Sequence, residues 1–168
     1  TVDALVRRSL VPVLVVRERA WEPYARVVVA TDFSPAARHA LVKAARWYPQ
    51  AELVLFHAHG APYSLRAGMD PMQAQLAGFQ QARQEADAFL QDAALPDDVR
   101  QRVRLELEHG DPAPLLNARG QAHGHDLLVL ATRGHSKLLH ILLGSVAQRI
   151  LEVAQNDVLL VPAPAAME

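Results

Sequence analysis

Residues 127–134 read Leu127-Leu128-Val129-Leu130-Ala131-Thr132-Arg133-Gly134, and Gly144-Ser145-Val146 follows after nine further residues. The first five residues of this stretch are apolar without alternation, which is typical of a strand buried on both faces of a parallel sheet. The chain then leaves the sheet at its carboxyl edge and crosses a loop that carries Arg133, His135, Lys137 and His140. The sequence therefore predicts a parallel α/β sheet with a polar crossing at this edge.

A helix is predicted to begin at Gly144-Ser145, with Ser145 as its N-terminal residue. Its apolar stripe is formed by Val146, Ala147, Ile150, Leu151 and Ala154. The free amides at a helix start attract anions, and small residues and cations precede them here. This combination favours a phosphate site. The alternative is a surface loop whose glycines serve only tight turns.

The composition restricts the class of protein. The chain has 168 residues, of which 51% are hydrophobic, and this suits one α/β domain with a full core and a small additional segment. Its formal charge of −1, from 17 basic and 18 acidic residues, gives no general attraction to nucleic acid or to a membrane surface. There is no cysteine, no apolar run long enough for a membrane span and no visible signal peptide. We therefore expect a cytoplasmic protein without a nucleic-acid or membrane partner.

Strands alternate with helices five times between residues 25 and 161, which implies a doubly wound, five-stranded parallel sheet flanked by helices. The strands are predicted at 26–30, 52–59, 103–107, 127–131 and 158–161. The helices are predicted to begin at Ser34-Pro35, Asp70-Pro71, Gly110-Asp111-Pro112 and Gly144-Ser145. Charged and apolar residues alternate at 103–107, which places this strand at the edge of the sheet.

The longest predicted helix runs from Asp70-Pro71 to about Ala94, and Pro96-Asp97-Asp98 is interpreted as its end. Its apolar residues recur at helical spacing and are interpreted as core packing rather than as part of a cofactor site. They are Met72, Leu76, Phe79, Ala82, Ala86, Phe89 and Leu90.

Several titratable residues allow both a functional and a structural interpretation. His57 and His59 lie on one face of a predicted strand, but no third ligand has a recognisable spacing, so a metal site is disfavoured. Glu106 and Glu108 are interpreted as a solvated face rather than as paired catalytic carboxylates. Asp32 ends the first strand, where doubly wound proteins bind ligands, although a lone aspartate there is more typical of a turn or a cap.

Three motifs resemble those of the universal stress protein family. Ala131-x-x-Gly134, followed after nine residues by Gly144-Ser145, resembles the family's nucleotide-binding signature G-x-x-G-(nine)-G-[ST] except at the first position, which is Ala131 here. The run Val28-Val29-Ala30-Thr31-Asp32-Phe33-Ser34-Pro35 resembles the family's opening strand. Gly110-Asp111-Pro112 is also found in the family at this place.

This resemblance implies the strand order 3-2-1-4-5 and a site for ATP, with or without Mg²⁺, across the carboxyl ends of the first and fourth strands. It implies that Asp32 contacts the adenosine moiety and that the backbone at Ala58 lies along the adenine edge. The loop that follows Ala131 would wrap the ribose and α-phosphate, and the start of the last helix would take the outer phosphates. The implied nucleotide-binding residues are Ala30, Thr31, Asp32, Ala58, Ala131, Thr132, Arg133, Gly134, Gly144, Ser145 and Val146.

Ala131 is the departure from the family signature, and it leaves two alternatives. If the family glycine lets the backbone approach the sugar or phosphates, the methyl group of Ala131 narrows the cleft. If the backbone there is ordinary extended strand, alanine costs little. The corresponding functions are an ATP-binding regulatory protein of the stress response and a nucleotide-free dimeric scaffold. A slow ATPase is a third possible function. The absence of a nucleophile-base pair or carboxylate cluster near the cleft disfavours it.

The beginning of the chain resembles its end. Thr1–Val16 aligns without a gap with Val146–Val161, so that Val13, Leu14, Val15 and Val16 fall on Val158, Leu159, Leu160 and Val161. This internal repeat predicts a helix, with Val2, Leu5, Val6 and Ser9 on one face, followed by a strand. The alternative is chance, because an amphipathic helix followed by a valine-rich strand is common.

The repeat resembles the last helix and strand of a preceding stress-protein domain. The expected organisation is a remnant at 1–17, a linker at 18–24, the stress-protein domain at 25–162 and a tail at 163–168, as in a tandem protein. The family also implies that the last strand pairs with its counterpart in a partner domain. An uncovered apolar edge strand invites aggregation. We therefore expect Val13–Val16 to cover Val158–Val161, within the chain or across a homodimer.

Overall fold

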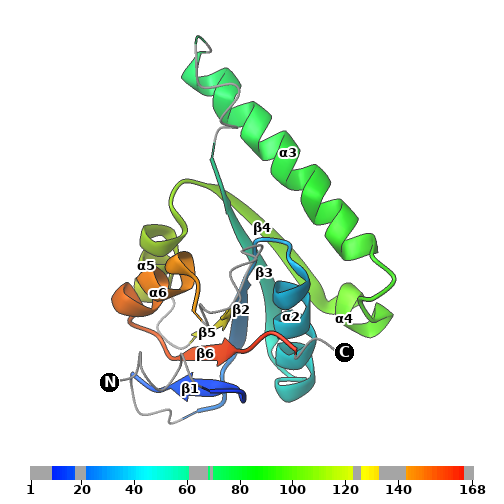
Figure 1. Cartoon of the computed structure of the whole chain (residues 1–168), viewed down its shortest axis with the longest axis vertical. Coiled ribbons are helices and arrows are strands. Elements are labelled where there is room, and N and C mark those ends of the chain that lie inside the picture. The colour runs from blue at the N-terminus through cyan, green and yellow to red at the C-terminus, as the bar shows by residue number, and fades with distance from the viewer. Residues whose placement is uncertain are drawn as a thin grey trace.

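The structure, a computed structural model, describes residues 9–17, 22–60, 68, 70–122, 126–132 and 143–164. Its strands are β1 (Val13–Val15), β2 (Arg26–Ala30), β3 (Glu52–His59), β4 (Val103–His109), β5 (Asp126–Ala131) and β6 (Val158–Val161). Its helices are α2 (Pro35–Trp47), α3 (Pro71–Gln91), α4 (Asp97–Arg102), α5 (Pro112–Ala122) and α6 (Ser145–Val153). Figure 1 shows α5 and α6 on one side of the sheet and α2, α3 and α4 on the other.

The six described strands form one sheet in the order β1-β6-β5-β2-β3-β4. Strands β2 to β6 run parallel to one another, and β1 runs antiparallel to β6. Counted along the chain from β2, the five parallel strands have the order 3-2-1-4-5, so this prediction is confirmed. The charged strand β4 lies at one edge of the sheet, also as predicted.

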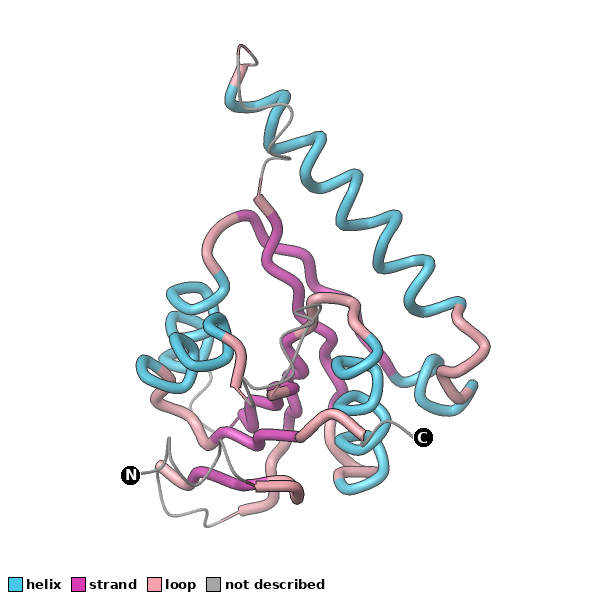
Figure 2. The backbone as a smooth tube through the Cα atoms, viewed as in Figure 1, coloured by secondary structure: helices cyan, strands magenta, loops and turns pink. Residues whose placement is uncertain are grey.

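Two buried clusters form the core, one on each face of the sheet. Neighbouring residues of a strand point to opposite faces. Leu127 and Val129 of β5 therefore join the cluster formed with α2 and α3, and Leu128 and Leu130 join the cluster formed with α5 and α6. Because helices cover both faces, as the tube trace of Figure 2 also shows, β5 has apolar residues at consecutive positions.

The predicted helix start at Ser34-Pro35 is confirmed. The Ser34 hydroxyl accepts a hydrogen bond from the Ala37 amide at 3.2 Å, and Pro35 occupies the first helical position. Ser34 is fully buried, so its hydroxyl caps the helix in an environment where water does not compete.

The predicted core stripe of α3 is wrong in its first half. Met72, Leu76 and Phe79 are 78%, 55% and 42% exposed. The buried residues of this helix are Ala74, Gly78, Ala82, Ala86 and Phe89. All of them except Phe89 are small. Figure 1 shows why: the first turns of α3 extend beyond the sheet. None of the helices in the described ranges is long and apolar enough to cross a bilayer.

The region after α3 also differs from the prediction. The helix ends at Gln91 rather than near Ala94, because Asp92 adopts an extended backbone. Its carboxylate accepts the Ala94 amide at 2.8 Å. The residues interpreted only as a helix end instead begin the short helix α4, which Val99 anchors in the core.

Strand β1 covers the β6 edge within the same chain. Val13, Leu14 and Val15 lie opposite Leu160, Leu159 and Val158, respectively. Val16, which was predicted to continue this strand, lies outside it and is 58% exposed. The helix predicted ahead of β1 lies outside the described residues, apart from Ser9.

Candidate functional site

The candidate site lies where the carboxyl ends of β2, β3 and β5 meet the start of α6. In the parallel sheet Ala30 of β2 lies opposite Leu130 of β5, so Thr31, which follows β2, and Ala131, the last residue of β5, lie at the same level. β3 continues beyond them, because Ala30 is already opposite Phe56. Carboxyl ends of neighbouring parallel strands are where doubly wound folds bind ligands.

The two described halves of the glycine motif are joined by a hydrogen bond. Gly144 donates its backbone N–H to the carbonyl oxygen of Thr132 at 2.8 Å, although eleven residues separate them. Thr132 is buried and donates its own amide to Val161 at 2.9 Å. The start of α6 is thereby attached to the ends of β5 and β6.

Gly144 is the N-cap of α6, and its backbone is extended, with φ −68° and ψ 153°. Among the described residues, the only atom within 4 Å of a Cβ added at this position is the Thr132 carbonyl oxygen, at 3.9 Å. The glycine is therefore not required by its backbone conformation. Within the described part of the chain, no side chain caps the first amides of α6.

Ser145 and Val146 begin α6 and are both exposed. The prediction that Val146 belongs to the buried stripe is wrong, since it is 48% exposed. The stripe is centred on Ala147, Ile150 and Leu151, and Val146 lies at its solvent-facing margin.

Ala131 is the last residue of β5 and pairs with Val161 in the regular parallel register. Its side chain is half-buried and packs against the cluster under α2. The backbone is therefore ordinary strand, which is the alternative in which alanine replaces glycine at little cost.

Asp32 is exposed and lies in a tight turn between β2 and α2. Its carboxylate accepts the Ser34 amide at 3.0 Å, and the Thr31 hydroxyl accepts the Phe33 amide at 2.8 Å. Phe33 has φ 61°, in the left-handed region that residues other than glycine seldom adopt. The turn function considered for Asp32 is thus present, and the same turn presents the carboxylate at the carboxyl edge.

Ala58 and the two histidines lie on opposite faces of β3. Ala58 is half-buried against the α5–α6 cluster. On the other face, His57 Nδ1 lies 2.8 Å from the Thr31 carbonyl oxygen, and the His59 ring packs beside His109, with 5.4 Å between centroids. Within the described ranges no three His, Asp or Glu side chains are arranged to hold a metal ion.

His57 and Phe33 are the residues that sequence reasoning missed at this site. Their rings lie 4.4 Å apart between centroids. The spacing of His57 on β3 indicated only which face it occupies, and nothing in the sequence pairs it with a turn 26 residues away. Arg133 and Gly134, also predicted for the site, lie outside the described residues.

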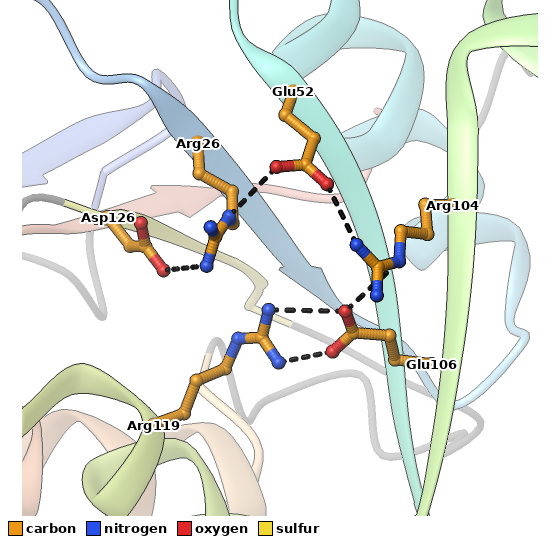
Figure 3. A network of polar contacts seen from close by, with 6 residues as sticks. All are labelled: Arg26, Glu52, Arg104, Glu106, Arg119 and Asp126. Carbon is orange, nitrogen blue, oxygen red and sulfur yellow. Dashed lines mark hydrogen bonds and ion pairs between the residues drawn. The ribbon is translucent and has the colours of Figure 1, made fainter. Parts of the chain in front are cut away.

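A charged network begins at the amino ends of three strands and extends to β4 and α5. It connects Arg26, Glu52 and Asp126, the first residues of β2, β3 and β5, with Arg104, Glu106 and Arg119 (Figure 3). The hydrogen bond from Arg26 lowers the pKa of Glu52 below its usual value.

Glu106, interpreted from sequence as part of a solvated face, is instead paired. Its side chain is 18% exposed and receives two contacts from Arg119 of α5, one of them at 3.3 Å. These charges are satisfied by one another, so the network joins α5 to the sheet rather than forming the ligand site.

Comparison with known proteins shows the family. The sequence model described as the Universal stress protein family matches residues 23–162. The chain belongs to this family. The matched region contains β2 to β6 and begins after β1, so the family domain includes the whole candidate site.

Solved structures of universal stress proteins share this fold. UspA from Lactobacillus plantarum is 20% identical with a TM-score of 0.65, and the match covers 83% of this chain and 99% of that one. A family member from Burkholderia pseudomallei is 26% identical with a TM-score of 0.58, covering 86% and 100%. A putative universal stress protein from Pseudomonas aeruginosa UCBPP-PA14 is 18% identical with a TM-score of 0.63. This match covers 95% of this chain but only 55% of the Pseudomonas chain. No curated protein is significantly similar in sequence.

Proposed function

We propose that this universal stress protein binds adenine nucleotide, with ATP as the ligand, at the carboxyl edge of β2 and β5. The observation that carries the proposal is the hydrogen bond from Gly144 to Thr132. It brings the start of α6, whose first amides are capped by no side chain of the described residues, against the end of β5. Such a helix start suits a phosphate chain, with Mg²⁺ arriving on the nucleotide if it is present.

The other residues of the turn and strands complete the proposed contacts. Asp32 is exposed at the same edge and would accept hydrogen bonds from ribose hydroxyls or the adenine amine. The backbone at Ala58 would lie along the base. The regular strand conformation of Ala131 supports a retained site, because its methyl group packs into the core cluster. Nucleotide occupancy would then serve as the regulatory signal in a cytoplasmic stress response.

Two Gly144 variants test the phosphate contact. Gly144→Ala adds one methyl group, which among the described residues meets only the Thr132 oxygen at 3.9 Å, so ATP affinity is expected to stay within threefold of the wild type. Gly144→Val places a branched side chain in front of the helix amides and is expected to weaken ATP at least tenfold. Calorimetry with Mg-ATP measures both, and unfolding curves check that the two variants remain folded.

A direct test needs no variant. The purified protein is denatured, and the released small molecules are separated and identified by chromatography and mass spectrometry. Released adenine nucleotide, or a thermal shift with Mg-ATP, supports the proposal. The absence of both, with a dissociation constant above 1 mM, contradicts it and favours the nucleotide-free scaffold.

We also propose that the segment before Arg17 is equivalent to the last helix and strand of a tandem partner domain. The pairing of β1 with β6 supports this. In the sequence repeat Leu14 corresponds to Leu159, and these two residues lie opposite each other at the centre of the antiparallel pair. Val13 lies opposite Leu160, and Leu160 is the residue that corresponds to Val15 in the repeat. The pairing is therefore symmetric, as it would be between two equivalent strands related by a two-fold axis.

A chain that begins at Arg17 tests this partner role of β6. Without β1, the apolar edge of β6 is expected to pair with a second copy, so light scattering should report a dimer or larger species. A monomer of unchanged solubility would contradict the proposal. Full-length protein carrying Leu14→Ala is the control, because it retains the β1 backbone.

A further inference from the structure

The turn that carries Asp32 holds an aromatic residue in a disfavoured conformation. Phe33 has φ 61°, where the Cβ of an L-residue crowds the backbone, and glycine or asparagine is the usual occupant. A disfavoured backbone persists only where its surroundings determine it, and such residues cluster at functional sites. The contacts around this turn therefore identify what maintains it.

The Phe33 ring is held between two side chains of the surrounding core. It lies 4.4 Å from the His57 ring on β3 and 5.6 Å from the Phe89 ring on α3, measured between centroids. Arg38 in turn lies over Phe89 at 5.3 Å and pairs with Asp92 at 2.7 Å. The ring of Phe33 is thus fixed from β3 and from α3.

Strand β3 also holds both backbone groups of Thr31. The Thr31 amide donates to the Phe56 carbonyl oxygen at 2.9 Å, and the Thr31 carbonyl oxygen lies 2.8 Å from His57 Nδ1. A carbonyl oxygen only accepts, so the hydrogen of the imidazole is on Nδ1. His57 therefore contacts the turn twice, through this donor and through its ring face on Phe33.

We propose that His57 is a positioning residue that holds Asp32 in its ligand-binding orientation by fixing Thr31 and Phe33 on either side of it. The inference deepens the proposed nucleotide function and rests on it. A histidine suits this place because one side chain supplies both a donor and an aromatic face. Phenylalanine would supply only the ring, and asparagine only a donor at the place of Nδ1.

The test compares His57→Phe and His57→Asn with the wild type in two measurements. Hydrogen exchange reports the Phe33 and Ser34 amides, which are both hydrogen-bonded within the turn. Calorimetry with Mg-ATP reports the affinity. In both variants we expect exchange of these amides to rise at least tenfold while exchange in β5 and β6 stays unchanged, and the affinity to fall at least fivefold.

Asp32→Asn separates positioning from direct contact. It keeps an oxygen that can accept the Ser34 amide, so exchange of the turn should stay near the wild-type rate while ATP affinity falls. If the His57 variants accelerate exchange equally throughout the sheet, or leave it unchanged in the turn, the proposal is overturned. Faster exchange in the turn with unchanged ATP affinity would overturn it as well. If wild-type protein binds no nucleotide, the proposed function fails, and with it the assignment of His57 to ligand binding.

Discussion

Tyr24 donates its hydroxyl hydrogen to Asp157 at 2.6 Å, and this contact ties the segment that follows β1 to the residue that precedes β6. The second carboxylate oxygen of Asp157 accepts the Arg17 amide, also at 2.6 Å. Burial and the Asp157 carboxylate raise the pKa of the Tyr24 hydroxyl far above its usual value, so the phenol remains a donor at all physiological pH values. Asp157 is 7% exposed and thus anchors the N-terminal segment from within the protein.

Asp157→Ala is expected to reduce the free energy of unfolding by about 2–3 kcal/mol, because it leaves the half-buried Tyr24 hydroxyl and the Arg17 amide without their acceptor. Tyr24→Phe removes one of these bonds and should cost about 1 kcal/mol. Urea unfolding measures both. A loss below about 0.5 kcal/mol for Asp157→Ala would show that the anchor is unimportant.

The unfolding free energy is expected to fall as the pH falls below the ordinary histidine pKa of 6.5. Burial, then the neighbouring His109 and His57, lower the pKa of His59. The unfolded chain therefore binds a proton that the native protein does not. The contribution of neutral His59 to the free energy of unfolding is fully present above pH 6.5. It is lost as the pH falls below 6.5, by at most about 1.4 kcal/mol per pH unit for one proton.

The groups around His59 do not offset this effect. His109 on β4 and His57 on β3 are the neighbours that act on its charge, and α3 carries no ionisable side chain between Pro71 and Ala82. Burial also lowers the pKa of His39, which adds a slope of the same sign. Urea unfolding at pH 7.5 and pH 5.5 should therefore show a smaller decline in His59→Phe than in the wild type. An equal decline in the two proteins would exclude His59 as the source.

Gly78→Ala is expected to destabilise the protein by about 1–2 kcal/mol, although alanine normally stabilises a helix by about 1 kcal/mol. A Cβ at this position would lie 2.3 Å from the Gly60 carbonyl oxygen, so α3 must move away from the end of β3. Gln80→Ala, on the exposed side of the same helix, is the control and should change stability by less than about 0.5 kcal/mol. Greater stability in Gly78→Ala would contradict the close approach of these backbones.

A matched pair on α3 tests which part of its predicted apolar stripe is buried. Leu76 is 55% exposed and Ala86 is fully buried. Leu76→Gln should change the unfolding free energy by less than about 0.5 kcal/mol, whereas Ala86→Gln should cost about 2–3 kcal/mol through overpacking and burial of an amide. A loss of about 2–3 kcal/mol in both variants, measured by thermal or urea unfolding, would restore the stripe predicted from periodicity, which includes both residues.

The local features of the fold followed from the sequence because their causes are local. Uninterrupted apolar residues at 127–131 require cover on both faces, and Ser34 followed by Pro35 starts a helix wherever it lies. The alternation of these elements, together with the family motifs, predicted the parallel sheet and its order. The motif at Gly144 also predicted that α6 begins at the carboxyl edge of the sheet, since a strand-to-helix crossing belongs at the carboxyl end of its strand.

Tertiary structure decided everything that depends on where an element lies relative to the others. The same helical periodicity describes Leu76 and Ala86, but only the second lies over the sheet, because α3 extends past the ends of the strands. His57 meets Thr31 because β2 and β3 are neighbours in one register, and Glu106 is paired because α5 brings Arg119 to β4. Periodicity and propensity act over a few residues, whereas these contacts join residues 13 or 26 positions apart and exist only once the sheet is assembled.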